Sequence, residues 1–194
     1  MPPTPTPTRA PLASPLESFP DQILADRAAD GDVRAFEVLV RRYGPLMRVY
    51  AGRVLGSNDE MDDVVQESFI TAWQQLPTLD NGAVVKSWLM RIVSRKSVDR
   101  LRARRQHLNI DLTDAPAPER HSPHRLAEAE SQTEALTHVL AGLPEDQRRC
   151  WMLRELAECS YGEIAEELEL PVSTVRGLLA RARKTLLQEM EEWR

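Results

Sequence analysis

Apolar residues recur every three or four positions over most of this chain, and that spacing constrains the fold more than any other feature. Between residues 59 and 76 they form a single stripe, made of Met61, Val64, Val65, Phe69, Ala72, Trp73 and Leu76. Such a stripe is typical of an amphipathic α-helix with one buried face. The alternating pattern of a half-buried β-strand is found nowhere in the sequence. We therefore predict an all-α fold.

Proline marks the borders of the helical parts. Seven of the fourteen prolines lie in residues 1–20, which we expect to form a disordered tail. Residues 106–129 hold three more prolines and few large apolar groups, so they are expected to be a flexible linker. Two small helical domains remain, at residues 21–105 and 130–194. Each is small enough to have only a thin core.

The pattern predicts helices at about 21–30, 32–54, 59–76 and 84–105, and in the second domain at 126–141, 144–158 and two shorter segments. Gly44 and Pro45 are expected to kink or split the second helix. Residues 77–83 are expected to form a loop. Trp73 and Trp88 fall on apolar stripes and are expected in the core. The sequence contains no apolar run long enough to cross a membrane and no secretory signal, which predicts a cytoplasmic protein.

Two cysteines, Cys150 and Cys159, lie nine positions apart without a CxxC pattern. We expect both to be small apolar core residues rather than redox or zinc-binding groups.

Charge is segregated along the chain, although the net charge is only −5. Residues 54–85 contain six acids and no base, residues 86–105 contain eight bases and one acid, and residues 171–185 contain four bases and no acid. An acidic protein with two local basic helices is expected to approach nucleic acid through those two faces only.

Residues 160–187 match a DNA-binding helix-turn-helix. Ser160 and Glu163 form a capping box, residues 169–172 form the turn, and Ser173 or Thr174 can cap the second helix. Early residues of that helix can reach base edges, and later ones can hold phosphates. The residues expected on its DNA face are Ser173, Thr174, Arg176, Gly177, Arg181, Arg183 and Lys184.

These features together resemble the sigma-70 family of RNA polymerase sigma factors, in particular the small two-domain extracytoplasmic-function (ECF) kind. The resemblance covers residues 21–105 and 130–194. Besides the helix-turn-helix, it is carried by AFEVLVRRYGPLM (35–47), DDVVQESFITAW (62–73), SWLMRIVSRKSVDRLR (87–102) and LPEDQRRCWMLREL (143–156).

The resemblance implies a role for each segment. The acidic helix would dock on the β′ clamp helices of core RNA polymerase through Asp62, Asp63, Gln66 and Glu67. The loop would hold a base flipped from the minus-ten element, with Thr78, Asp80 and Asn81 as candidates. The basic helix would follow the minus-ten backbone through Lys86, Arg91, Arg95, Lys96 and Arg100.

The helix-turn-helix would read the minus-thirty-five element, near the polymerase β flap. The linker would thread toward the RNA exit path. The resemblance further implies a monomer without cofactor, metal, catalytic residue or small-molecule substrate. No sensor domain is expected after the second domain, so control is expected from an anti-sigma factor.

The chain departs from the family pattern at two places. It has Arg95 where members often have Asn, and Gly177-Leu178 where they often have Ser-Arg. The DNA sequence of the minus-thirty-five element that this chain recognises therefore cannot be inferred from its relatives.

Two other functions could account for parts of the sequence. A free-standing helix-turn-helix regulator would bind paired half-sites as a dimer without polymerase, but this leaves residues 35–105 without a role. A metal-dependent nuclease could use Asp59, Asp63 and Glu67, which share a helix face, but it would need ligands from a second segment that the sequence does not offer. Acids in a first helical turn are favourable in any case. We expect the chain not to be an enzyme.

Overall fold

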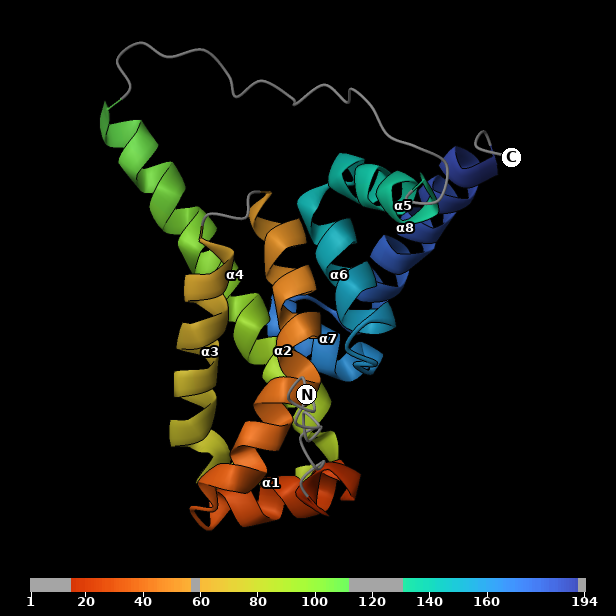
Figure 1. Cartoon of the computed structure of the whole chain (residues 1–194). Helices are drawn as coiled ribbons and strands as arrows, with labels where there is room; N and C mark the ends of the chain where they lie inside the picture. The colour runs from red at the N-terminus through yellow and green to blue at the C-terminus, as the bar shows by residue number, and fades with distance from the viewer. Residues whose placement is uncertain (1–14, 57–59, 112–130, 192–194) are drawn as a thin grey trace, which may run out of the picture.

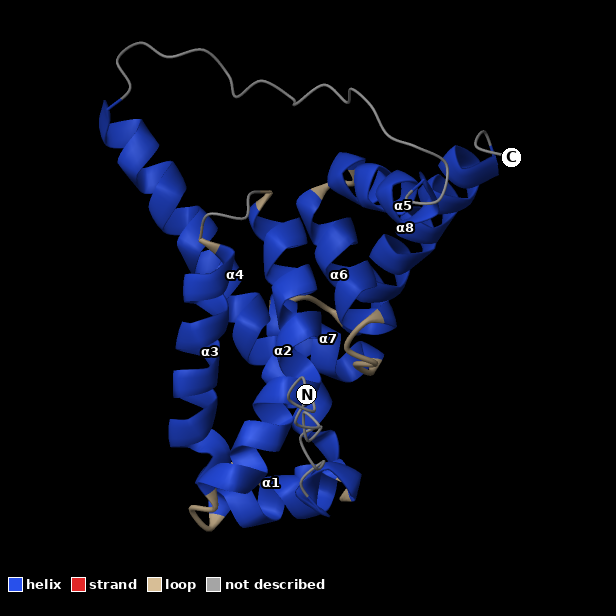
Figure 2. Cartoon of the chain, in the orientation of Figure 1, coloured by secondary structure: helices blue, strands red, loops and turns tan. Residues whose placement is uncertain are grey.

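The computed structural model describes residues 15–56, 60–111 and 131–191, and every regular element in these ranges is helical (Figures 1 and 2). The α-helices are α1 (Asp21–Ala29), α2 (Val33–Leu55), α3 (Met61–Gln75), α4 (Val85–Asp111), α5 (Ser131–Gly142), α6 (Glu145–Glu155), α7 (Tyr161–Leu168) and α8 (Val172–Glu191). Single 3-10 turns cover Pro15–Ser18, Leu76–Thr78 and Gly82–Val84. The all-α prediction is confirmed for these residues. Among the helices described, none has the length and apolar character needed to cross a membrane.

Helix α2 organises the first module, which we define as residues 15–111. It begins where the Asp32 carboxylate accepts hydrogen bonds from the backbone N–H groups of Arg34 and Ala35, at 3.0 and 3.2 Å. It ends at Gly56, whose φ of 70° is the left-handed conformation that glycine adopts without strain. A kink or a split was expected at Gly44 and Pro45, and the split does not occur, since α2 continues through Pro45. Pro45 is exposed, and buried residues on both sides of it hold the helix against the same core.

The segment before α1 packs onto this module. Leu16 is buried, and the Arg42 guanidinium donates to the backbone carbonyls of Glu17 and Phe19 at 3.0 and 3.3 Å. Residues 15–20 therefore differ from the disordered tail expected there, because one apolar side chain and two carbonyls find partners on the bundle. Residues 1–14 of the expected tail lie outside the described ranges.

Helix lengths also differ from expectation near the predicted linker. Helix α4 continues to Asp111, six residues past the expected end, and α8 is a 20-residue helix rather than a short one. Residues 112–130, which include most of the predicted linker and the expected start of the next helix at 126, lie outside the described ranges.

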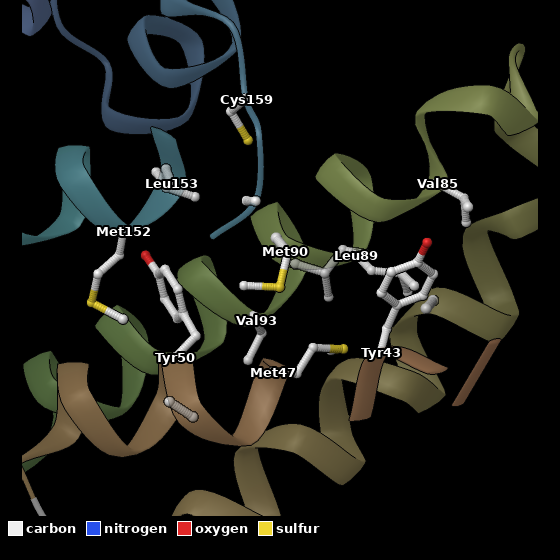
Figure 3. Packing of buried hydrophobic residues seen from close by; sticks show 14 of the residues in the cluster. Tyr43, Met47, Tyr50, Val85, Leu89, Met90, Val93, Met152, Leu153 and Cys159 are labelled. Atoms are coloured by element: carbon white, nitrogen blue, oxygen red, sulfur yellow. The ribbon is translucent and has the colours of Figure 1, made fainter. Parts of the chain in front are cut away.

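The two predicted domains share one hydrophobic core. Met152, Leu153 and Cys159 of the second module (residues 131–191) belong to the same buried cluster as Tyr50 and Met90 of the first (Figure 3). The Tyr50 hydroxyl, fully buried there, donates to Ser94 Oγ at 3.0 Å, and burial raises the pKa of Tyr50 to about 12. Helix α6 packs against both α2 and α4, so the thin core expected for each module is continuous with that of the other. A smaller cluster joins α5 and α8.

Candidate functional site

Helix α3 presents its polar side chains to solvent. Asp62, Asp63, Gln66 and Glu67, which we call the acidic face of α3, are all exposed, whereas Val64, Ser68 and Ala72 on the opposite side are buried. Asp62 pairs with Arg48 at 3.1 Å and Glu67 with Arg100 at 2.9 Å. Asp63 forms no ion pair with the residues that the structure describes. The structure therefore brings the four residues together on one accessible surface.

An apolar groove lies beside the acidic face of α3. Its volume is about 670 Å³, and Asp62, Gln66 and Arg48 line it together with apolar side chains of α2 and α3. The Ile70 side chain is 52% exposed there. The ring centroids of Phe36 and Trp73 lie 5.0 Å apart. Trp73 is thus half-buried beside a groove rather than fully in the core.

The groove was not expected from the sequence. The available signal was Ile70, an apolar residue that lies four positions after Gln66 and so falls on the polar side of the helix, off the buried stripe.

The loop between α3 and α4 carries the three candidate base-binding residues. Thr78, Asp80 and Asn81 are all exposed. Thr78 Oγ1 donates to the Gln75 carbonyl at 2.7 Å, and Asn81 Oδ1 accepts from the backbone N–H of Ala83 at 3.0 Å. A Cβ at Gly82 would lie 2.9 Å from the Gln22 carbonyl, so only glycine allows the loop to rest this closely on α1.

The basic side chains of α4 are largely paired with carboxylates. Lys86 Nζ lies 2.7 Å from Glu158 Oε1, Arg91 Nη1 lies 3.7 Å from Glu166 Oε2, and Arg95 Nε lies 2.8 Å from Glu167 Oε2. All three acids belong to the second module.

Two other candidates on α4 have different surroundings. Arg100 pairs within the first module, with Glu67 at 2.9 Å and Glu60 at 3.5 Å. Lys96 is half-buried. All five bases were expected on a free surface. The acidic partners of Lys86 and Arg95 could not be recognised from the sequence, because they lie 72 positions away.

The helix-turn-helix has the local structure expected from its sequence. The Ser160 hydroxyl accepts from the Glu163 N–H at 3.2 Å, while the Glu163 carboxylate accepts from the Ser160 N–H at 2.8 Å, completing the capping box. Although burial opposes it, these bonds and one from Ser87 lower the pKa of Glu163. The turn contains Glu169 at φ 54°.

One detail of the turn differs from expectation. Helix α8 begins at Val172, so Ser173 and Thr174 lie in its first turn and neither caps it. The Pro171 carbonyl instead accepts from the N–H groups of Thr174 and Val175, at 2.9 and 3.1 Å.

The exposed side of α8 displays most of the candidate minus-thirty-five residues. Arg176, which is exposed, lies over the Tyr161 ring at 5.8 Å, and Arg154 lies over the same ring at 5.1 Å. Arg183 pairs with Glu155 at 3.1 Å. Ser173, Arg181 and Lys184 are exposed, while Thr174 and Gly177 are half-buried. Tyr161 was not expected at this surface, because only spatial proximity links it to Arg176.

Both cysteines are buried free thiols. Burial raises the pKa of Cys150 to about 11 and that of Cys159 to about 12. Their environment fits the expectation that they act as small apolar core residues.

Comparison with known proteins assigns both modules. Residues 39–107 match the family model of sigma-70 region 2, and residues 133–186 match that of sigma-70 region 4. The ECF RNA polymerase sigma-E factor of Salmonella typhimurium is 34% identical over 180 residues, which cover 88% of this chain and 94% of that protein.

Two solved structures resemble the fold. CnrH, in complex with the cytosolic domain of CnrY, is 31% identical, with a TM-score of 0.59 over 89% of this chain and 97% of that one. RpoE of Bartonella quintana, in complex with the anti-sigma factor NepR, has a TM-score of 0.67 at 22% identity, over 80% of this chain and 96% of that one. The second likeness concerns the fold alone.

Proposed function

Because this chain belongs to the sigma-70 family of RNA polymerase sigma factors, within its ECF group, we propose that its first module docks on core polymerase and that its basic helices recognise the promoter. A sigma factor supplies promoter recognition to a polymerase that performs the chemistry. We assign no catalytic residue to this chain and propose that it works as a monomer in the cytoplasm.

The acidic face of α3 and the adjoining apolar groove carry the proposed polymerase contact. An acidic surface repels DNA and suits a basic protein partner, and the groove supplies apolar area that a helical partner can bury. Asp62, Asp63, Gln66 and Glu67 would meet the β′ clamp helices at the rim. Asp63 is the residue whose charge is uncompensated within the described chain, so it is available to an arginine or lysine of the partner.

Promoter recognition is divided between two surfaces in this proposal. Thr78, Asp80 and Asn81 would hold a flipped minus-ten base while Lys86, Arg91, Arg95, Lys96 and Arg100 follow the backbone. The exposed residues of α8 would enter the major groove of the minus-thirty-five element near the β flap, with Arg176 reaching bases and Arg183 and Lys184 reaching phosphates.

Control by an anti-sigma factor is the proposed regulation. CnrH, which is 31% identical to this chain, is seen bound to the cytosolic domain of CnrY. A partner of that kind would act by covering the polymerase-binding and DNA-binding surfaces. The alternative of a free-standing regulator is not supported, because it assigns no role to residues 35–105. Residues 39–107 match region 2 of the sigma-70 family.

Capture of core RNA polymerase by the immobilised full chain tests the polymerase contact. We expect Asp63→Arg to weaken capture strongly, because it places a like charge against a basic partner surface. Asp30→Arg, an equal charge change at an exposed site between α1 and α2, is the matched control and should bind like the wild type. Equal capture by both variants would contradict the assignment of the acidic face of α3.

A further inference from the structure

The loop between α3 and α4 is built of two short turns that rest on the same helix. Leu76–Thr78 and Gly82–Val84 are both 3-10 turns, and both pack on α1. Helix α1 lies across the end of the bundle at which α3 ends and α4 begins (Figure 1). Buried Leu76 and Val85 fix the loop at its two ends. Helix α1 is therefore the common support beneath the candidate base-binding residues.

The loop comes closest to α1 at Gly82, which is buried between two exposed residues. A Cβ at this position would lie 2.7 Å from Asp26 Oδ1 and 2.9 Å from the Gln22 carbonyl oxygen. The φ angle of Gly82 is not positive, so its backbone conformation is open to any residue. Glycine is needed here only for space. A larger residue would push the loop away from α1.

Helix α1 is itself fixed at the turn that touches Gly82. The carboxylate of Asp21, the first residue of α1, accepts hydrogen bonds from the Tyr43 hydroxyl and the Arg42 guanidinium of α2. Tyr43 is buried, so this anchor is tied to the core of the first module. Because Gln22 directly follows Asp21, the anchor on α2 and the contact with the loop belong to the same turn of α1. The position of the loop relative to α2 is thus set through α1.

From this arrangement we infer that α1 positions the loop for base selection at the minus-ten element, with Gly82 and Asp21 as positioning residues that do not touch DNA. The inference rests on the proposed function, which assigns Thr78, Asp80 and Asn81 to a flipped base. A base is selected by hydrogen bonds, and these weaken steeply when donor and acceptor are misaligned. A loop that rests on a fixed helix holds its polar groups in place before the base arrives, so less ordering is needed on binding.

A promoter library with a randomised minus-ten element tests the inference, using the full chain and core RNA polymerase. Sequencing of the transcripts gives the base preference at every position of the element. The double variant Thr78→Ala/Asp80→Ala, which truncates two exposed side chains, identifies the position that the loop reads. In the wild type we expect the preferred base to be favoured there by about tenfold. We expect Gly82→Ala to reduce that preference to about twofold and to leave the other positions unchanged, because the added methyl group displaces the loop.

Two further variants separate the position of the loop from the stability of the fold. Gly142→Ala makes the same chemical change at the exposed end of α5, where no atom lies within 4 Å of the added Cβ, and it should leave every preference unchanged. Asp21→Ala removes the anchor of α1 and adds no atom near the loop. Its side chain is 28% exposed, so folding should be retained. We expect Asp21→Ala to reduce the preference at the same position as Gly82→Ala, although by a smaller factor, since the apolar contacts of α1 remain.

The inference is overturned if Gly82→Ala and Asp21→Ala keep the wild-type preference at the position that the loop reads. It is also overturned if they lower transcription while the profile of preferences stays the same, because that result shows a role in stability alone. Thermal melting and capture by core polymerase, which uses the acidic face of α3, show that each variant is folded, and Asp21→Ala decides the question if Gly82→Ala does not melt cooperatively. A library in which Thr78→Ala/Asp80→Ala changes no preference would instead contradict the role that the proposed function gives to the loop.

Discussion

Arg176 shows how a single residue of the DNA-binding face is prepared for its role. Tyr161 lies beneath its guanidinium, and Arg154 lies over the same ring. A long side chain held against an aromatic ring loses less freedom when it binds, since part of its ordering is already complete. The sequence indicated Arg176 from its position in the helix-turn-helix, but no local pattern linked it to a tyrosine at the start of the preceding helix.

We predict that Arg176→Ala weakens recognition at promoters that depend on the minus-thirty-five element. The expected loss is about 1–3 kcal/mol if the guanidinium makes a bidentate contact with a base. It is checked by comparing transcription from a native element and from single-base variants of it. Arg183→Ala is the comparison, because a phosphate contact should weaken all sequences alike. A uniform loss for Arg176→Ala would mark it as a phosphate contact too.

The cysteines give a second test at this scale. Burial raises the pKa of Cys150 to about 11 and of Cys159 to about 12, so very little thiolate is present at neutral pH. We expect both thiols of the folded chain to react with iodoacetamide far more slowly than a cysteine introduced at exposed Gln188, and all three to react at similar rates in denaturant. Rapid modification of the native thiols at neutral pH would contradict their buried environment.

Among the helices, the ends that carry a strong local sequence signal were predicted best. The capping box at Ser160 and Glu163 and the cap at Asp32 are recognisable because each involves residues two or three positions apart. The sequence predicted a kink or a split at Pro45, and the split does not occur because tertiary packing supports α2 through its proline. The cap predicted at Ser173 or Thr174 was wrong, because the Pro171 carbonyl begins α8. Local rules state a preference, and packing decides between alternatives of similar free energy.

The ion pair between Glu60, just before α3, and Arg104 of α4 makes the stability of the fold depend on pH. Hydrogen bonding to Arg104, together with the charges of Arg104 and Arg100, holds the pKa of Glu60 below its ordinary 4.5. A lowered pKa in the folded state adds stability that is present above pH 4.5 and is lost as the pH falls through the folded-state value.

We therefore predict that Glu60→Gln lowers the free energy of unfolding by about 0.5–1 kcal/mol at pH 7, and that the difference from the wild type shrinks as the pH falls below 4.5. Urea unfolding at a series of pH values measures this. Glu37→Gln, on an exposed and looser pair with Arg41, is the control and should change little. A difference that persists or grows in acid would refute the pairing.

At the scale of the whole molecule, the sequence predicted the parts better than their arrangement. Charge segregation identified an acidic helix and two basic ones, and the structure keeps the acidic face of α3 exposed. The charge pattern of the sequence did not reveal that α7 covers part of α4. The paired residues are about 70 positions apart, and each helix face taken alone has the charges of a solvent-exposed surface. The shared core was missed for the same reason: helical periodicity shows which face is buried, not what buries it.

Run-off transcription with core RNA polymerase and the full chain, on a library of genomic fragments, shows whether this chain directs promoter-specific initiation. We predict transcripts that start at a fixed distance downstream of two sequence elements, one near minus ten and one near minus thirty-five, and that disappear with Asp63→Arg. A chain that supports no transcription, or that binds paired half-sites as a dimer and gains nothing from core polymerase, would contradict this prediction.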